Sequence, residues 1–174
     1  MRIHKRNKGV SLLEVMIAVM VFSVGMLGMA GLMLVSQRTN HSAFLRTQAS
    51  FLAQSMADRM RSNIGGVWAG LYTSTGYPET GGSVPACTLV APCNITNIAT
   101  RDRQQWSATM QNLLPGPTAR INCTRTLNLS VPAHMRNRGT PYDGVCTIVM
   151  TWKESALNKG ADAADQSFAW VFQP

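Results

Sequence analysis

The sequence predicts an α+β protein in which one long N-terminal helix packs on a small antiparallel sheet. Three observations predict this fold class. An apolar run begins at Val10, an amphipathic helical pattern follows from residue 45 to residue 60, and short stretches of alternating apolar residues occur in the last third of the chain. The first two patterns indicate one helix with two kinds of surface, and the third indicates strands.

The apolar run is long enough to cross a membrane. Val10 to Val35 comprises 26 residues, and as a helix it would measure about 39 Å, against about 30 Å for the core of a bilayer. The first nine residues contain no acidic residue and four basic ones, which are Arg2, Lys5, Arg6 and Lys8. The positive-inside rule therefore places these nine residues in the cytoplasm and the C-terminal part on the other side of the membrane.

Beyond Arg38 the helix is expected to continue with one apolar face. The apolar positions here recur at helical spacing, and they are Leu45, Ala49, Leu52, Ala53, Met56 and Met60. The charged and polar residues between them are Arg46, Gln54, Asp58 and Arg61. This pattern predicts a helix to about Ser62, ended by Gly65 and Gly66, with its apolar face buried against a sheet.

The next stretch predicts a long loop and a second helix. Residues 68–92 are rich in Gly, Pro, Ser and Thr, which is typical of a loop. The segment "DRQQWSATMQNLLPG" predicts a helix in which Asp102 suits the positive N-terminal end and Trp106 faces the core. Pro115 and Gly116 are expected to stop this helix.

Three strands are predicted after this helix. Alternation places Leu127, Leu129 and Val131 on one face of a strand over residues 123–131. A second strand over residues 146–152 has Cys146, Ile148, Met150 and Trp152 on one face. A third has an aromatic face formed by Phe168, Trp170 and Phe172. The turn-rich "NRGTPYDG" is expected to join the first two strands as an antiparallel pair.

The four cysteines permit three pairings. A Cys87–Cys93 bridge would close the loop, and a Cys123–Cys146 bridge would join the first two strands near their ends. We expect disulfides, because thiols exported from the cytoplasm are normally oxidised. Of the three pairings, this is the one we expect. The alternative is a zinc site, but the chain has no C-x₂-C pattern and its three histidines do not cluster with the cysteines.

The charge distribution and the motif content argue against two other classes. Without the first nine residues the net charge falls from +8 to +4 (12 basic and 8 acidic residues), and the remaining arginines are scattered. We therefore expect no nucleic-acid partner. The sequence contains no paired acids in a motif, no nucleophile elbow, no phosphate loop and no metal-ligand cluster. These observations predict a protein without catalytic residues, metal or cofactor.

The segment "RNKGVSLLEV" resembles the class III leader of type IV pilins and pseudopilins. Its order is a basic stretch, a glycine, an apolar residue, a glutamate and an unbroken apolar helix. The resemblance implies that a prepilin peptidase cuts after Gly9 and methylates the new N-terminus at Val10. It also implies that Glu14 neutralises the N-terminal ammonium of a neighbouring subunit in a filament. Val10 departs from the family, in which phenylalanine is usual.

A wider resemblance covers most of the chain. The Asp…Trp…Leu-Pro-Gly helix, the cysteine strands and "CTIVMTWKE" are similar to the minor pilins of the PilV type. This resemblance implies a pilin-like fold and a role in priming or tipping a type IV pilus. The implied partners are the prepilin peptidase, the major pilin and other minor pilins, the inner-membrane assembly platform and a tip adhesin. The implied location is the bacterial inner membrane, with the C-terminal domain in the periplasm, and then the pilus.

The implied domains are a leader (1–9), a transmembrane and assembly helix (10–37), its amphipathic continuation (38–64) and a periplasmic α+β domain (65–174). Within the assembly helix, Gly25, Gly28 and Gly31 recur at intervals of three. Small residues let helices approach closely. The resemblance also implies that the middle of this helix can lose its hydrogen bonds when the filament forms. Each glycine lowers the free-energy cost of this loss by about 1 kcal/mol relative to alanine.

Two alternative functions remain. A pseudopilin of a type II secretion system would share the same leader and helix. A membrane-anchored or secreted periplasmic binding protein would instead have an ordinary signal sequence, for which Gly28-Met29-Ala30 offers a cleavage site. Glu14 argues against that second alternative, because a carboxylate in the apolar part of a signal is costly.

Overall fold

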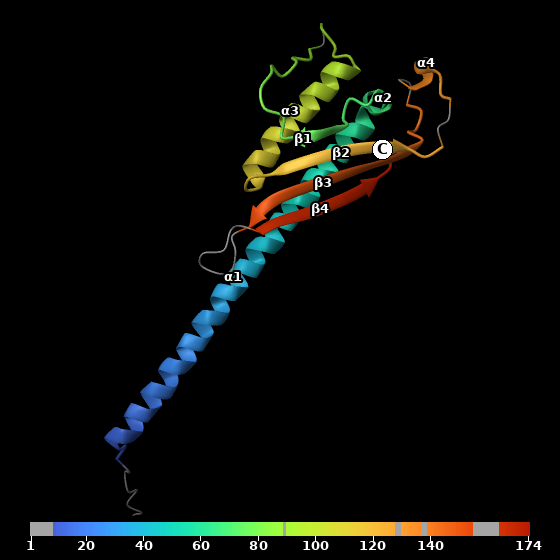
Figure 1. The fold of residues 1–174 in the computed structure, drawn as a ribbon. Coiled ribbons are helices and arrows are strands. Elements are labelled where there is room, and N and C mark those ends of the chain that lie inside the picture. The colour runs from blue at the N-terminus through green and yellow to red at the C-terminus, as the bar shows by residue number, and fades with distance from the viewer. Residues whose placement is uncertain (1–8, 89, 128–129, 137–138, 155–163) are drawn as a thin grey trace, which may run out of the picture. The chain divides into compact units, whose positions relative to one another are not determined.

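The computed structural model describes residues 9–88, 90–127, 130–136, 139–154 and 164–174. Its elements (Figure 1) are the helices α1 (Leu12–Ser62), α2 (Ile64–Trp68), α3 (Ile95–Leu113) and α4 (Ala133–Arg136), and the strands β1 (Ser74–Tyr77), β2 (Thr118–Arg125), β3 (Gly144–Glu154) and β4 (Ala164–Phe172). The chain divides into two compact units, Met1–Ser42 and Ala43–Pro174. The predicted α+β class, a long N-terminal helix packed on a small antiparallel sheet, is confirmed.

The sheet has four strands in the order β1-β2-β3-β4, and every neighbouring pair is antiparallel. One face of β3 is fully buried, as predicted, and its residues are Cys146, Ile148, Met150 and Trp152. The predicted aromatic face of β4 also points inward, with Phe172 buried and Phe168 and Trp170 packed against the core. Alternation therefore identified both strands, because one face of each is buried and the other is not.

The predicted amphipathic half of α1 is confirmed. All six apolar residues that the pattern selected are buried, and so is Ala57. The helix ends at Ser62, as expected, but Gly65 and Gly66 lie inside the short helix α2. Gly66 meets a packing requirement there, since a Cβ on it would lie 2.6 Å from Nδ2 of Asn63 and 3.0 Å from the Tyr72 ring.

The second helix is longer than predicted. α3 begins at Ile95, where the side chain of Asn94 accepts a hydrogen bond from the backbone N–H of Asn97 at 2.8 Å. Asn94 is therefore the N-cap. Asp102 was predicted to lie at the N-terminal end of the helix, but it lies in the middle. This prediction was wrong because the helix begins earlier, at Ile95, where the side chain of Asn94 caps it.

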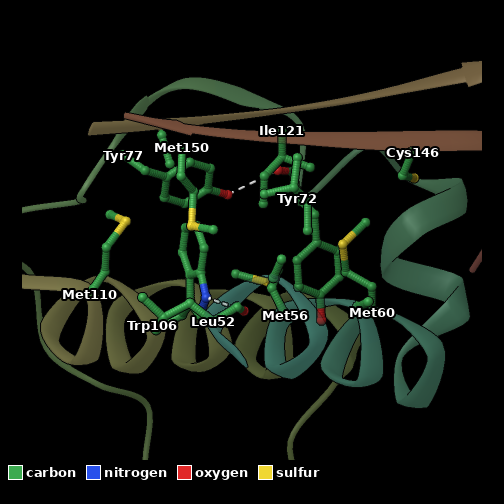
Figure 2. Packing of buried hydrophobic residues seen from close by; sticks show 14 of the residues in the cluster. Leu52, Met56, Met60, Tyr72, Tyr77, Trp106, Met110, Ile121, Cys146 and Met150 are labelled. Carbon is green, nitrogen blue, oxygen red and sulfur yellow. Dashed lines mark hydrogen bonds between the residues drawn. The ribbon is translucent and has the colours of Figure 1, made fainter. Parts of the chain in front are cut away.

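Trp106 of α3 is a core residue, as predicted. It is 1% exposed, and its indole N–H donates to the backbone oxygen of Leu52 in α1 at 2.9 Å. Figure 2 shows Leu52 and Met56 of α1 beside Trp106, with Ile121 and Met150 of the sheet facing them. The two helices and the sheet thus enclose one hydrophobic core.

Two strand predictions were wrong. The strand predicted over 123–131 runs instead from Thr118 to Arg125, so its inward residues are Ala119 and Ile121. Leu127 is exposed, Val131 is outside any strand, and Leu129 lies outside the described residues. The segment 68–92 was predicted as a loop only, but it contains the edge strand β1. Short Ser- and Gly-containing edge strands have little apolar alternation, so this one left no periodic signal.

The structure contains the disulfides Cys87–Cys93 and Cys123–Cys146, the pairing expected from the sequence. Cys123 and Cys146 are directly opposite each other in the β2–β3 register. Cys87 and Cys93 close a loop of the chain before α3, and the described residues include no free cysteine.

A polar network joins α1, α3 and the segment between them. One carboxylate oxygen of Asp102 accepts from the Tyr72 hydroxyl at 2.7 Å, and the other accepts from the Arg59 guanidinium at 3.0 Å. Asn63 donates to the Tyr72 hydroxyl at 3.0 Å. Burial raises the pKa of Tyr72, and the hydrogen bond to Asp102 raises it further. Burial, and then the charge of Glu79, raise the pKa of Tyr77.

A second polar cluster lies at the C-terminal end of β2. Arg125 donates from Nε and Nη2 to the two carboxylate oxygens of Asp143, each at 2.8 Å. Its guanidinium also lies 5.1 Å from the centre of the Trp68 ring, which packs edge-on against Tyr142. Hydrogen bonding to Asp143 raises the pKa of Arg125, and burial raises that of Tyr142. These contacts fix the loop before β3 to the sheet.

Candidate functional site

The residues of the leader motif lie at the start of α1. Gly9 and Val10 precede the helix in exposed, non-helical backbone. The backbone oxygen of Ser11 accepts from the N–H groups of Glu14 at 3.0 Å and Val15 at 3.2 Å. The peptide bond between Gly9 and Val10 is thus accessible and lies just outside the first helical turn.

Ser11 was not singled out in the sequence, although a signal for it is present. "SLLE" has the S-x-x-E spacing of a capping box directly before an apolar run. In the structure Ser11 immediately precedes the first helical residue, Leu12, and Glu14 lies in the first turn. The start of the helix therefore coincides with the leader motif.

The Glu14 side chain is exposed, and the side chains around it are apolar. Together with Val10 it lines a hollow along the helix, whose other residues are Val15, Ala18, Val19 and Phe22. Among the described residues no cation lies within ion-pair distance of the Glu14 carboxylate. The positive end of the helix dipole favours a carboxylate at this position, but only by about 0.3–1 kcal/mol. A positively charged partner for the Glu14 carboxylate would have to lie outside the described residues.

The first half of α1 has an apolar surface with nothing packed on it. Its large apolar side chains, from Leu12 to Val35, are between 51% and 78% exposed. By length and composition, α1 is the one helix in the described residues that could cross a membrane. An apolar surface this long and continuous is far larger than a soluble monomer normally exposes to water.

The three glycines of this helix have no close neighbours. Apart from adjacent residues and the backbone of the helix itself, no described atom lies within 4 Å of the position that a Cβ would take at Gly25, Gly28 or Gly31. The helix is also unbroken through all three residues. Packing among the described residues therefore does not explain glycine at these positions. The two interpretations are close approach of another helix and local melting, and both concern contacts with other subunits.

The structure brings Gly9, Val10 and Glu14 together and places the cysteines elsewhere. All four cysteines belong to the unit Ala43–Pro174. The basic residues of the leader, Arg2 to Lys8, lie outside the described residues. Within the described part of the chain, no three His, Cys, Asp or Glu side chains are grouped so that they could hold a metal ion.

Comparison with known families identifies the same segment. Residues 4–30 match the prokaryotic N-terminal methylation motif. No curated protein matches the chain, and no solved structure does. The match covers Gly9, Val10, Glu14 and two of the three glycines, Gly25 and Gly28. It supports a type IV pilin or pseudopilin that is processed by a prepilin peptidase. It also points to a structural protein anchored in a membrane rather than to an enzyme.

Proposed function

We propose that this chain is a minor pilin of a type IV pilus, which is cut after Gly9, methylated at Val10 and used in priming the filament or forming its tip. The observation that carries the proposal is the methylation motif over residues 4–30, followed by an exposed apolar helix. The similarity of "CTIVMTWKE" and the α3 segment to minor pilins of the PilV type supports the finer assignment.

The proposal gives each part of the chain a role. Residues 1–9 are the leader, and residues 10–37 hold the protein in the inner membrane before assembly. Residues 38–64 contain the rest of this helix, which ends at Ser62, and residues 65–174 complete a periplasmic domain. The basic leader stays in the cytoplasm because positive charge is retained there. The partners are the peptidase, the assembly platform, the major pilin and other minor pilins, and a tip adhesin.

The chemistry of assembly follows from the placement of Glu14. Cutting after Gly9 creates an ammonium group on Val10, one helical turn before the carboxylate. Burying either charge alone in an apolar filament would be costly, whereas pairing them across two subunits offsets that cost. The leader must therefore be removed before the helix can pack, because an uncut chain has no ammonium at this place.

The test is the intact mass of the mature protein, isolated from membranes. We expect a chain that begins at methylated Val10. Gly9→Val should leave the full-length precursor, and Ala30→Val should be processed normally. The opposite pattern, with a mature chain beginning at Gly31 and processing blocked by Ala30→Val, would establish an ordinary signal sequence and disprove the proposal.

A pseudopilin of a type II secretion system is the second candidate, because the same motif match supports it. Both candidates predict the same mature N-terminus, so the mass does not separate them. The protein's presence in sheared pili separates them, as does the effect of deleting the chain on twitching and on protein secretion. Loss of secretion with normal pili would favour the pseudopilin.

A further inference from the structure

The outer face of the sheet carries a hollow that most of its lining residues border with hydroxyl or guanidinium groups. Its volume is about 400 Å³, and its lining comes from three strands and the edge strand β1. The lining residues are Thr75, Thr118, Ala119, Arg120, Val149, Thr151 and Ser167. A hollow of this size falls in the range of small-molecule sites, about 300–1,000 Å³.

The strand register explains why hydroxyl groups gather there. Thr118 on β2 is opposite Thr151 on β3, and Thr151 is opposite Ser167 on β4. The three residues therefore form one row across the sheet, and all of them point away from the core. The hydroxyls of Thr118 and Thr151 are hydrogen-bonded to each other. Thr75 on the edge strand adds a fourth hydroxyl to the hollow.

Arg120 lies in the adjacent row, opposite Val149. Among the described residues no hydrogen bond or ion pair engages its guanidinium. Four other described arginines of the globular unit each form an ion pair with a carboxylate. They are Arg59, Arg61, Arg103 and Arg125. Arg120 thus offers its donors to solvent from within a hollow, where a planar oxygen acceptor can reach them.

Few other charges occur on this face. The outward positions of β2, β3 and β4 carry two further charged residues, Lys153 and Asp165, which are opposite each other in the register. Their charges offset each other, so Arg120 determines the net charge of the face. The hollow combines one uncompensated positive charge, four hydroxyls and an apolar floor at Val149.

We infer that this hollow binds a carboxylate-bearing saccharide, such as a uronic acid residue of a surface polysaccharide. The carboxylate would accept hydrogen bonds from Arg120, the ring hydroxyls would exchange hydrogen bonds with the threonine and serine hydroxyls, and an apolar face of the ring would cover Val149. The inference does not depend on the proposed function, because it rests only on the globular unit.

The same features disfavour a nucleic acid as the ligand. A protein that tracks a phosphate backbone neutralises several phosphates with several cations. The hollow has one guanidinium and no aromatic side chain on which a base could stack. A single carboxylate matches one guanidinium, whereas a polyphosphate would leave most of its charge unmatched.

The experiment is calorimetric titration of the full-length protein in detergent micelles with an α-1,4-linked trigalacturonate. We expect saturable binding, and binding at least tenfold weaker for the trisaccharide methyl ester, which has the same shape without the charge. Arg120→Gln should weaken trigalacturonate binding roughly tenfold, and Thr151→Val roughly threefold, as expected for charged and neutral hydrogen bonds. Arg101→Gln, the matched control, changes the net charge equally but lies on α3 and should bind like the wild type.

Several outcomes would overturn the inference. These are no saturable binding by the wild type, equal binding of the acid and its methyl ester, or equal weakening by Arg120→Gln and Arg101→Gln. Tighter binding of a single-stranded decanucleotide that is lost in Arg120→Gln would assign the hollow to nucleic acid instead. Thermal unfolding of each variant shows whether it is folded, and since Arg120 is exposed we expect no loss of stability in Arg120→Gln. Processing at Gly9 is a separate readout and does not bear on this result.

Discussion

Glu14 is the residue whose placement is hardest to explain within one chain. It precedes 23 uncharged residues, it is exposed, and the described residues offer its carboxylate no ion-pair partner. A carboxylate in apolar surroundings costs free energy unless a positive group meets it. Val10 lines the same hollow, so the ammonium that processing would create lies on the same side of the helix start.

Glu14→Ala should therefore separate processing from assembly. The substitution makes the helix more apolar, so insertion in the membrane and cutting after Gly9 should be normal. Incorporation into the filament should fall strongly, because removing one partner of a buried ion pair typically costs about 3–5 kcal/mol. Precursor processing is measured in membranes, and incorporation is measured in sheared filaments.

Normal incorporation of Glu14→Ala would contradict an assembly role, with one exception. A subunit at the very tip has no neighbour above it and would tolerate the loss of the carboxylate. Glu14→Lys resolves this case, because a reversed charge would face the ammonium of any subunit packed against it. A tip subunit should tolerate both changes, whereas a subunit inside the filament should tolerate neither.

At the scale of elements, one buried carboxylate takes part in the contact between α1 and α3. Asp102 is 9% exposed and satisfies both of its oxygens, one from Tyr72 and one from Arg59. Arg59 also donates to Gln105 at 3.0 Å, one turn along α3. These hydrogen bonds fix the rotation of α3 against α1, while Trp106 supplies the apolar contact beside them.

We expect Asp102→Asn to destabilise the globular unit by about 1.5–3 kcal/mol, the usual value of hydrogen bonds to a charged group. The control is Asp58→Asn, because Asp58 pairs with Arg61 on the exposed side of the same helix that provides Arg59. An exposed ion pair is worth about 0–1 kcal/mol. Urea unfolding of both variants measures the difference. Equal destabilisation would show that the network contributes no more than a surface pair.

The elements differ in how well the sequence predicted them, and the reason is how much of each element is buried on one side. The amphipathic half of α1 and the strands β3 and β4 bury alternate or helically spaced residues, so their patterns were clear. β1 has four residues and only Tyr77 buried, and β2 has an inward face of Ala119 and Ile121. The exposed apolar Leu127 therefore shifted the predicted strand toward the C-terminus.

The two sites differ in the same way. Gly9, Val10 and Glu14 are neighbours in the sequence, so a local motif was enough to predict them. The hollow around Arg120 depends on the register of three strands, which places Thr118, Thr151 and Ser167 in one row. The strand predicted over residues 123–131 did not include Thr118, so the sequence could not place Thr118 opposite Thr151. The arrangement follows only from the completed sheet.

At the scale of the whole molecule, the described hydrophobic core belongs to one of the two compact units. Its residues run from Leu45 to Phe172, and none comes from the unit Met1–Ser42. The stability of the fold is therefore a property of residues 43–174. The apolar half of α1 contributes a surface for the membrane or for other subunits instead.

The globular unit should lose stability in alkali because of Tyr72 and Tyr77. Both pKa values are raised in the folded chain, chiefly by burial, so the unfolded chain loses these protons first. Their contribution is fully present below the unfolded pKa of about 10 and is lost as the pH rises above it. Each tyrosine can contribute up to about 1.4 kcal/mol per pH unit.

Urea unfolding at a series of pH values from 9 upward measures this slope. Tyr77→Phe should reduce the slope, because only one of the two buried tyrosine hydroxyls can then ionise. Other groups also titrate in this range, so the difference between the wild type and the variant is the relevant quantity. Identical slopes in the two proteins would show that Tyr77 ionises equally easily in the folded and unfolded chains.

The division into units predicts which truncation still folds. A chain of residues 43–174 keeps every residue of the described core and both disulfides. We expect it to be soluble, because it lacks the exposed apolar run, and to unfold cooperatively when it is purified in oxidised form.

A chain beginning at Ala57 lacks Leu52 and Met56, which are 1% and 0% exposed in the core. Truncating one such side chain to alanine typically costs about 2–5 kcal/mol, against a total of about 5–15 kcal/mol for a domain. The shorter chain should therefore have no thermal transition and no near-ultraviolet circular dichroism. A cooperative transition in both chains would show that the second half of α1 is not needed for the fold, and its absence in both would show that residues before 43 are.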